Sequence, residues 1–136
     1  TLPSSLKELS GEFDAVIHLA GLYDFNANYA ENYLGNVVAT QTLIDWAQGK
    51  TNRILYASTF AIHSPDQEGT LAEERLAKLP SREIGYSYTK ALAEELLLGS
   101  AFELDVFRLG SLVAGPSDFV PEKLDGPYAF MKVLSY

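Results

Sequence analysis

Three short segments that are apolar on both faces alternate with two long stretches of helical periodicity, and this alternation limits the possible folds more than any other feature. The segments are 13–21, 53–58 and 104–109, and the helical stretches run over 28–48 and 83–98. Strands that are apolar on both faces belong in a parallel sheet that helices cover. Two successive strand–helix–strand units therefore predict an α/β fold with a doubly wound parallel sheet.

The flanking segments give weaker signals. Residues 1–12 carry leucines at helical spacing and reach Gly11, which indicates the last turns of a helix. The proline, acidic and glycine residues of 64–70 predict a loop. Residues 125–127, with the sequence DGP, are typical of a helix start with proline in its first turn, so a further helix is expected there.

Length and charge limit what the chain can form and bind. A chain of 136 residues can bury a core but is short for two ordinary domains, so residues 1–136 are expected to form a single domain. The net charge is -8, and the lysines and arginines are scattered. Such a chain is unsuited to a nucleic acid backbone, and a small-molecule substrate is the expected partner.

Residue content also bears on compartment and membrane. The chain has no cysteine, which excludes disulfides and agrees with a reducing, cytoplasmic location. Its apolar runs are far shorter than the ~20 residues that span a bilayer, so no membrane span is expected. No metal site is expected either. The chain begins with Thr1 rather than methionine, so residues upstream of it are expected.

All three predicted strands end in small or hydroxyl-bearing residues. These ends are 18–21, 57–59 and 108–111. Parallel strands bring their carboxyl ends to one edge of the sheet, where proteins of this class bind ligands. Because small residues let a ligand approach the backbone, the sequence predicts a ligand site formed by these segments.

Tyr86 and Lys90 lie four residues apart in the second long helix, so their side chains share one face. A phenol has a pKa near ~10, and a nearby ammonium lowers that pKa by favouring phenolate. Thr59, at the end of the preceding strand, can hydrogen-bond a substrate carbonyl beside the phenol. The three side chains predict a site that protonates a carbonyl as hydride arrives from a nicotinamide.

Tyr128 and Lys132 repeat the same spacing near the end of the chain. No strand end with a hydroxyl side chain comes shortly before them. We therefore interpret Tyr128 as a packing aromatic residue and Lys132 as a solvated lysine, and assign the chemistry to the earlier pair.

Five motifs, in this order along the chain, resemble those of the extended short-chain dehydrogenase/reductases. They are DAVIHLAG (14–21), NVVAT (36–40), LYASTFAI (55–62), YSYTK (86–90) and FRLGSLVAGP (107–116). This superfamily contains nucleotide-sugar epimerases and dehydratases, thioester reductases and fatty acyl-CoA reductases. The resemblance implies a Rossmann-like, NAD(P)-binding fold, of which the chain holds the C-terminal strands and helices.

The resemblance also implies roles for single residues. Thr59 takes the place of the catalytic serine or threonine, Tyr86 that of the acid/base, and Lys90 that of the lysine that binds ribose and lowers the phenol pKa. The cofactor implied is NADP, with NAD as an alternative. The residues expected to bind it are Ala20, Gly21, Asn36, Ser58, Tyr86, Lys90, Gly110 and Ser111.

Several polar residues near these positions have structural interpretations. His18, on a buried strand, is expected to be a hydrogen-bonded core histidine. Asn36 is expected to bridge backbone groups or an ordered water rather than touch substrate. Ser58 either contacts the cofactor or only hydrogen-bonds its strand. The carboxylates of 66–74 are expected to form a solvated loop.

Two elements of the family pattern are absent from the sequence. The glycine-rich first turn that binds the pyrophosphate does not occur, nor does the charged residue that separates NAD from NADP. The family carries both before the point that matches Thr1. The chain is therefore expected to be the C-terminal portion of a cofactor domain and to be inactive when isolated.

The segment after the third strand separates branches of the superfamily. Nucleotide-sugar enzymes usually carry Asn-x-Tyr-Gly-Pro there, whereas residues 111–116 read SLVAGP. The residues that follow, 117–134, resemble thioester and fatty acyl-CoA reductases, which implies NADPH-dependent reduction of an acyl thioester or aldehyde. The alternatives are a nucleotide-sugar epimerase or dehydratase, another carbonyl reductase, and a nicotinamide-binding module without catalysis.

Overall fold

The computed structural model describes residues 6, 8–24, 26–63 and 68–112. The helix start expected at 125–127, the Tyr128–Lys132 pair and residues 1–5 and 7 of the first expected helix lie outside these residues. The elements, in chain order, are β1 (Val16–His18), α2 (Tyr29–Asn32), the π-helix η1 (Tyr33–Val38), α3 (Ala39–Ala47), β2 (Arg53–Thr59), the 3-10 turn η2 (Phe60–Ile62), α4 (Gly85–Leu98) and β3 (Glu103–Leu109).

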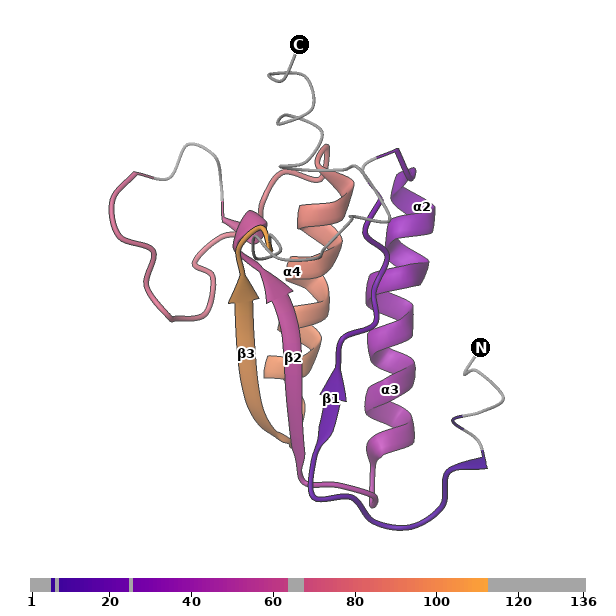
Figure 1. Cartoon of the computed structure of the whole chain (residues 1–136). Coiled ribbons are helices and arrows are strands. Elements are labelled where there is room, and N and C mark those ends of the chain that lie inside the picture. The colour runs from indigo at the N-terminus through magenta and orange to yellow at the C-terminus, as the bar shows by residue number, and fades with distance from the viewer. Residues whose placement is uncertain (1–5, 7, 25, 64–67, 113–136) are drawn as a thin grey trace, which may run out of the picture.

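The three strands form one parallel sheet in the order β1-β2-β3, which confirms the predicted α/β class with a parallel sheet. In register, Ile17 lies opposite Leu55, and Leu55 lies opposite Asp105. Helices connect successive strands, as parallel pairing requires. All three strands therefore end at the same edge of the sheet (Figure 1).

β1 is shorter than the apolar run at 13–21 predicts. Only Val16–His18 pair with β2. Leu19 and Gly21 have left the ladder and line a pocket beyond the strand end. An apolar run therefore indicates which segment is buried, but it does not predict how many of its residues form backbone hydrogen bonds with the neighbouring strand.

The long helix predicted at 28–48 begins and ends close to where the sequence places it. Asn28 caps it, accepting from the amide of Glu31 at 3.0 Å, while the Glu31 carboxylate accepts from the amide of Asn28 at 2.8 Å. This reciprocal pair satisfies two amides that have no partner within the helix. The helix then runs through α2, η1 and α3 to Ala47.

The π-helical turn η1 is a feature that helical periodicity did not predict. Its wider turn holds more residues than an α-helical turn, so side chains beyond it are rotated relative to the expected pattern. Gly35 lies in η1, and a Cβ there would come within 2.7 Å of the Leu22 Cβ. The glycine therefore allows the loop after β1 to pack directly on this turn.

Helices α3 and α4 both pack on one face of the sheet (Figure 1). Together with β2 they enclose the core, which consists of Ile44, Ala47, Ile54, Tyr56, Ala93 and Leu97. On the opposite face, Ile17 is 65% exposed and Phe107 is 49% exposed. Within the described residues the sheet is thus covered on one side, although its strands are apolar on both. No helix in this part of the chain has the length and apolar content to cross a bilayer.

Candidate active site

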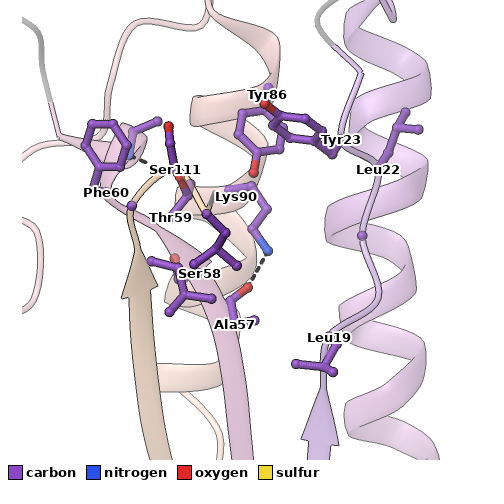
Figure 2. A pocket seen from close by; sticks show the side chains of 15 residues that line it. Leu19, Leu22, Tyr23, Ala57, Ser58, Thr59, Phe60, Tyr86, Lys90 and Ser111 are labelled. Atoms are coloured by element: carbon purple, nitrogen blue, oxygen red, sulfur yellow. Dashed lines mark hydrogen bonds between the residues drawn. The ribbon is translucent and has the colours of Figure 1, made fainter. Parts of the chain in front are cut away.

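A pocket of about 430 Å³ lies at the carboxyl ends of the three strands (Figure 2). The loop after β1, the end of β2, α4 and the segment after β3 all contribute side chains to it. Of the residues that sequence analysis singled out, it is lined by Gly21, Ser58, Thr59, Tyr86, Lys90, Gly110 and Ser111. Ala20 and Asn36 are not among its lining residues. The structure thus brings together residues far apart in the sequence.

Thr59 and Tyr86 are joined by a side-chain hydrogen bond across the pocket. Thr59 is the last residue of β2 and has an extended backbone, with φ -139° and ψ 146°. Its Oγ1 also accepts a hydrogen bond from the amide of Ala61 at 3.2 Å. The backbone bond orients the threonine hydroxyl at the strand end, so two hydroxyl groups from different elements point to one spot.

The pKa of Tyr86 is raised, mainly because the phenol is partly buried and also because the phenol of Tyr23 lies close by. The hydrogen bond with Thr59 acts in the opposite direction. The rings of Tyr23 and Tyr86 meet edge to face, with centroids 5.4 Å apart (Figure 2). Lys90 is not among the groups that shift the pKa of Tyr86 in this arrangement, so the expected effect of Lys90 on the phenol stays a prediction.

Lys90 points under the pocket rather than at the Tyr86 hydroxyl. Its Nζ donates to the carbonyl oxygen of Ala57 at 2.8 Å (Figure 2). The same Nζ lies 4.3 Å from the centre of the Tyr56 ring. Burial lowers the pKa of Lys90 to about 8, and the carboxylate of Glu94 opposes that change. A backbone carbonyl and an aromatic face therefore hold the ammonium.

His18 is a core histidine, in agreement with its structural interpretation. Its Nε2 is 2.9 Å from the Thr40 Oγ1, and its ring packs against Tyr56 with centroids 5.3 Å apart. Burial, and to a smaller extent the nearby charge of Lys90, lower the pKa of His18 to about 4. The imidazole is therefore neutral at physiological pH.

We expect the stability of the protein to fall as the pH drops from about 6.5 to about 4 because of His18. In this window the unfolded chain binds a proton at His18 and the folded chain does not, so acid favours unfolding. The shift corresponds to about 3 kcal/mol of unfolding free energy. Urea unfolding across a pH series measures it. His18→Gln, which keeps a hydrogen-bonding group for Thr40 but does not titrate, should flatten the dependence in this window, and an unchanged slope would contradict the assignment.

Asn36 bridges backbone groups, as its structural interpretation predicts. Its Oδ1 accepts from the amide of Leu22 at 2.8 Å, and its Nδ2 donates to the Thr89 Oγ1 at 3.1 Å. A Cβ on Gly21 would come within 2.9 Å of the Asn36 Oδ1. Asn36 thus ties the loop that lines the pocket to η1 and α4, and Gly21 allows that close approach.

Ser58 has a partner that neither interpretation of this residue considered. Its Oγ donates to the Glu94 Oε2 at 2.7 Å, so the idea that it only hydrogen-bonds its own strand is wrong. Arg108 also donates to Glu94, with its NH2 2.6 Å from Oε1. Sequence reasoning missed Glu94 and Arg108. The available signal was that Glu94 follows Lys90 by four residues and so shares its helix face.

The acidic loop before α4 agrees with its predicted solvated character. Glu68, Glu73 and Glu74 are all exposed. Arg108 donates through NH2 to the backbone carbonyl of Glu74 at 2.7 Å, so the loop is attached to β3 through its backbone rather than its carboxylates.

A parallel sheet with helices on it and a pocket beyond its strand ends is the Rossmann-like arrangement, and the fold matches that of solved NAD-binding domains. A family model for NAD-binding domains, described as Male sterility protein, matches residues 2–136. The chain belongs to this family.

Individual relatives agree with this assignment. The chain is 33% identical over 128 residues to a 4-hydroxy-2-methyl-3-oxo-4-farnesyl-3,4-dihydroquinoline-1-oxide ketoreductase from Stigmatella aurantiaca, a match that covers 89% of this chain and 38% of that protein. The fold is similar to a thiolation-reductase di-domain from an archaeal non-ribosomal peptide synthetase, with TM-score 0.66, 24% identity, and coverage of 96% of this chain and 37% of that one. It is also similar to a UDP-glucuronic acid 4-epimerase from Bacillus cereus solved with NAD, with TM-score 0.65 and 21% identity. This match covers 79% of this chain and 36% of that one. The chain therefore spans little more than a third of the length of these relatives.

Proposed function

We propose that this chain provides the carbonyl-reducing part of the active site in an NADP(H)-dependent oxidoreductase that acts on an acyl thioester or aldehyde. The observation that carries the proposal is the hydrogen-bonded pair of Thr59 and Tyr86 inside the pocket, with Lys90 beneath it. Two hydroxyls that meet in a half-enclosed pocket suit a carbonyl oxygen, which accepts two hydrogen bonds. We also infer that residues 1–136 are the C-terminal portion of the cofactor-binding domain.

The pocket fits the nicotinamide end of a dinucleotide. A Cβ at Gly110 would meet no atom within 4 Å, so there is open space beside this backbone. Gly21 and Ser111 border the same pocket from the two neighbouring segments. In this proposal Gly21, Gly110 and Ser111 face the cofactor, Ser111 lies near its carboxamide, and Lys90 binds its ribose. A bound nicotinamide cofactor supplies the hydride.

Tyr86 is proposed to donate the proton and Thr59 to orient the carbonyl. The raised pKa of Tyr86 keeps its hydroxyl protonated near neutral pH, which is the state that a proton donor needs in a reduction. The Thr59 hydroxyl fixes the direction of the phenol and can then bond the carbonyl oxygen. Once the Thr59 hydroxyl donates its one proton to the carbonyl oxygen, the Tyr86 hydroxyl donates to the same oxygen and transfers its proton there.

Two observations support carbonyl reduction over other chemistry of this superfamily. The Stigmatella relative, which matches most of this chain, is a ketoreductase. Residues 111–116 lack the tyrosine of the Asn-x-Tyr-Gly-Pro segment that is typical of nucleotide-sugar enzymes. An acyl thioester is proposed among the substrates because residues 117–134 resemble the corresponding segment of thioester and fatty acyl-CoA reductases.

Turnover by the full-length protein tests the proposal. The protein is incubated with NADPH or NADH and a panel that contains an acyl thioester, an aldehyde, a ketone and a UDP-sugar, and cofactor absorbance and products are measured. We expect NADPH to be consumed with the thioester or aldehyde. Epimerisation of the UDP-sugar, or cofactor binding without turnover of any substrate, would overturn the proposal in favour of an epimerase or a non-catalytic module.

We expect the 136-residue chain alone to bind NADPH at best weakly and to catalyse nothing. Its sequence has no glycine-rich turn for the pyrophosphate, whose recognition needs backbone amides at a helix start. NADPH fluorescence titration of the isolated chain against the full-length protein measures the difference. Binding by the isolated chain at micromolar concentrations, comparable to the full-length protein, would contradict this expectation.

A further inference from the structure

One face of α4 contacts the last three residues of β2. Three α4 residues at four-residue spacing each contact one of three consecutive β2 residues: Tyr86 with Thr59, Lys90 with Ala57, and Glu94 with Ser58. The first two pairs belong to the proposed active site. The third pair lies one helical turn deeper and has no role in the proposed chemistry.

Glu94 is a buried carboxylate with an unusually complete set of partners. It is 1% exposed, yet it lies on the helix that carries the proposed proton donor. Its Oε2 accepts from the Ser58 Oγ at 2.7 Å, and its Oε1 accepts from the Arg108 NH2 at 2.6 Å and from the Arg108 Nε at 3.2 Å. A guanidinium and a hydroxyl together supply the hydrogen bonds that a buried carboxylate needs.

This network reaches three elements and a loop. Ser58 belongs to β2 and precedes Thr59, and Arg108 belongs to β3. Arg108 also donates to the backbone carbonyls of Ala72 at 3.4 Å and Glu74 at 2.7 Å, which lie in the loop before α4. The carboxylate is therefore the point where the strand end, the helix and the loop are joined.

Glu94 also acts on Lys90. The two residues are four apart on one helix face, which places their side chains one turn apart. The titratable groups that surround the Lys90 ammonium come from every element packed around it, and in the described part of the chain they are His18 from β1, Tyr56 from β2, and Tyr86 and Glu94 from α4. Among the causes that act on Lys90, Glu94 is the one that favours its charged form.

We propose that Glu94 is a positioning residue of the active site: its buried carboxylate keeps Lys90 charged, and its bonds to Ser58 and Arg108 fix the strand end that carries Thr59. The first part concerns a property of Lys90 itself, whereas the benefit to catalysis rests on the proposed function. The physical reason is that Lys90 is buried and its charge is costly there, so an opposite charge one turn away raises the fraction of Lys90 that stays protonated near neutral pH.

The test measures the titration of Lys90 directly. Lysine labelled with ¹³C is incorporated into the full-length protein, the Lys90 signal is assigned by its loss in Lys90→Met, and its chemical shift is followed over a pH series. In Glu94→Gln, which keeps the shape but removes the charge, we expect the ratio of charged to neutral Lys90 at a fixed pH to fall by about tenfold or more, as loss of a close opposite charge implies.

The neighbouring glutamate offers a matched control. Glu95 lies on the same helix and pairs with Arg75, but this pair is on the exposed side of α4. Glu95→Gln should therefore leave the Lys90 titration unchanged. Equal shifts in Glu94→Gln and Glu95→Gln, or no shift in either, would overturn the proposal.

A second variant covers the case in which Glu94→Gln does not fold. The double variant Glu94→Gln with Arg108→Met removes both charges of the buried pair, a change that proteins often tolerate. Because Arg108 is not among the groups that shift Lys90, this variant should show the same loss of charge at Lys90. If Lys90 titrates in it as in the wild type, the proposal is wrong. A shifted Lys90 in a protein that turns over no substrate would leave this inference standing and reject only the proposed function.

Discussion

Tyr86→Phe is expected to lower kcat of the full-length protein by about 100- to 10,000-fold, the usual contribution of a positioned acid. The substitution removes one oxygen, which in our proposal is the proton donor, and leaves the ring that packs against Tyr23. Cofactor affinity should change little, because the ribose contact is assigned to Lys90. Steady-state kinetics and cofactor titration separate these two effects.

Tyr88→Phe is the matched control for this prediction. Tyr88 lies on the same helix, two residues along, and its ring packs against Tyr29 with centroids 6.3 Å apart rather than lining the pocket. It should keep near wild-type activity. If Tyr86→Phe and Tyr88→Phe behaved alike, the assignment of the proton donor would be wrong. Tyr128→Phe, which removes the hydroxyl of the tyrosine in the second Tyr-Lys pair, should also leave kcat unchanged.

Lys90→Met is expected to weaken cofactor binding and turnover together, each by at least about tenfold, because a charged hydrogen-bond donor is lost. The pH dependence is the sharper signature. In the wild type the ammonium is present below a pKa of about 8 and is lost above it, so cofactor affinity should decline as the pH rises through about 8. Lys90→Met cannot titrate and should lack this decline. Isothermal titration across a pH series measures both.

The control for Lys90→Met is Lys78→Met, at an exposed position in the loop before α4. It should bind cofactor as the wild type does and keep the pH dependence. If Lys90→Met retained wild-type affinity and an unchanged pH profile, Lys90 would have no electrostatic role in the site. An upward move of the pH optimum for turnover in Lys90→Met would further indicate that the ammonium does reach the Tyr86 phenol during the reaction.

Part of the candidate site could be read from spacing alone. Tyr86 and Lys90 share a helix face because four residues are about one turn, and Thr59 was expected beside them because parallel strands end at one edge. The Thr59–Tyr86 bond agrees with that expectation. His18 and Asn36 were also understood correctly, since a polar side chain on a buried element must find a hydrogen-bond partner.

The sequence by itself determined the class of fold and that Tyr86 and Lys90 share one face of α4, because the period of a helix or strand records which side chains lie on the same side. Only the tertiary structure decided which groups pair. Lys90 bonds Ala57, 33 residues away, and Ser58 bonds Glu94, 36 residues away. Such partners depend on how elements distant in the chain approach one another, and on local departures such as the π-helical turn η1. A one-dimensional pattern of polar and apolar residues holds no information on these distances. The role of the Glu94 carboxylate beside Lys90 could therefore be recognised only from the packing of α4 on the strands.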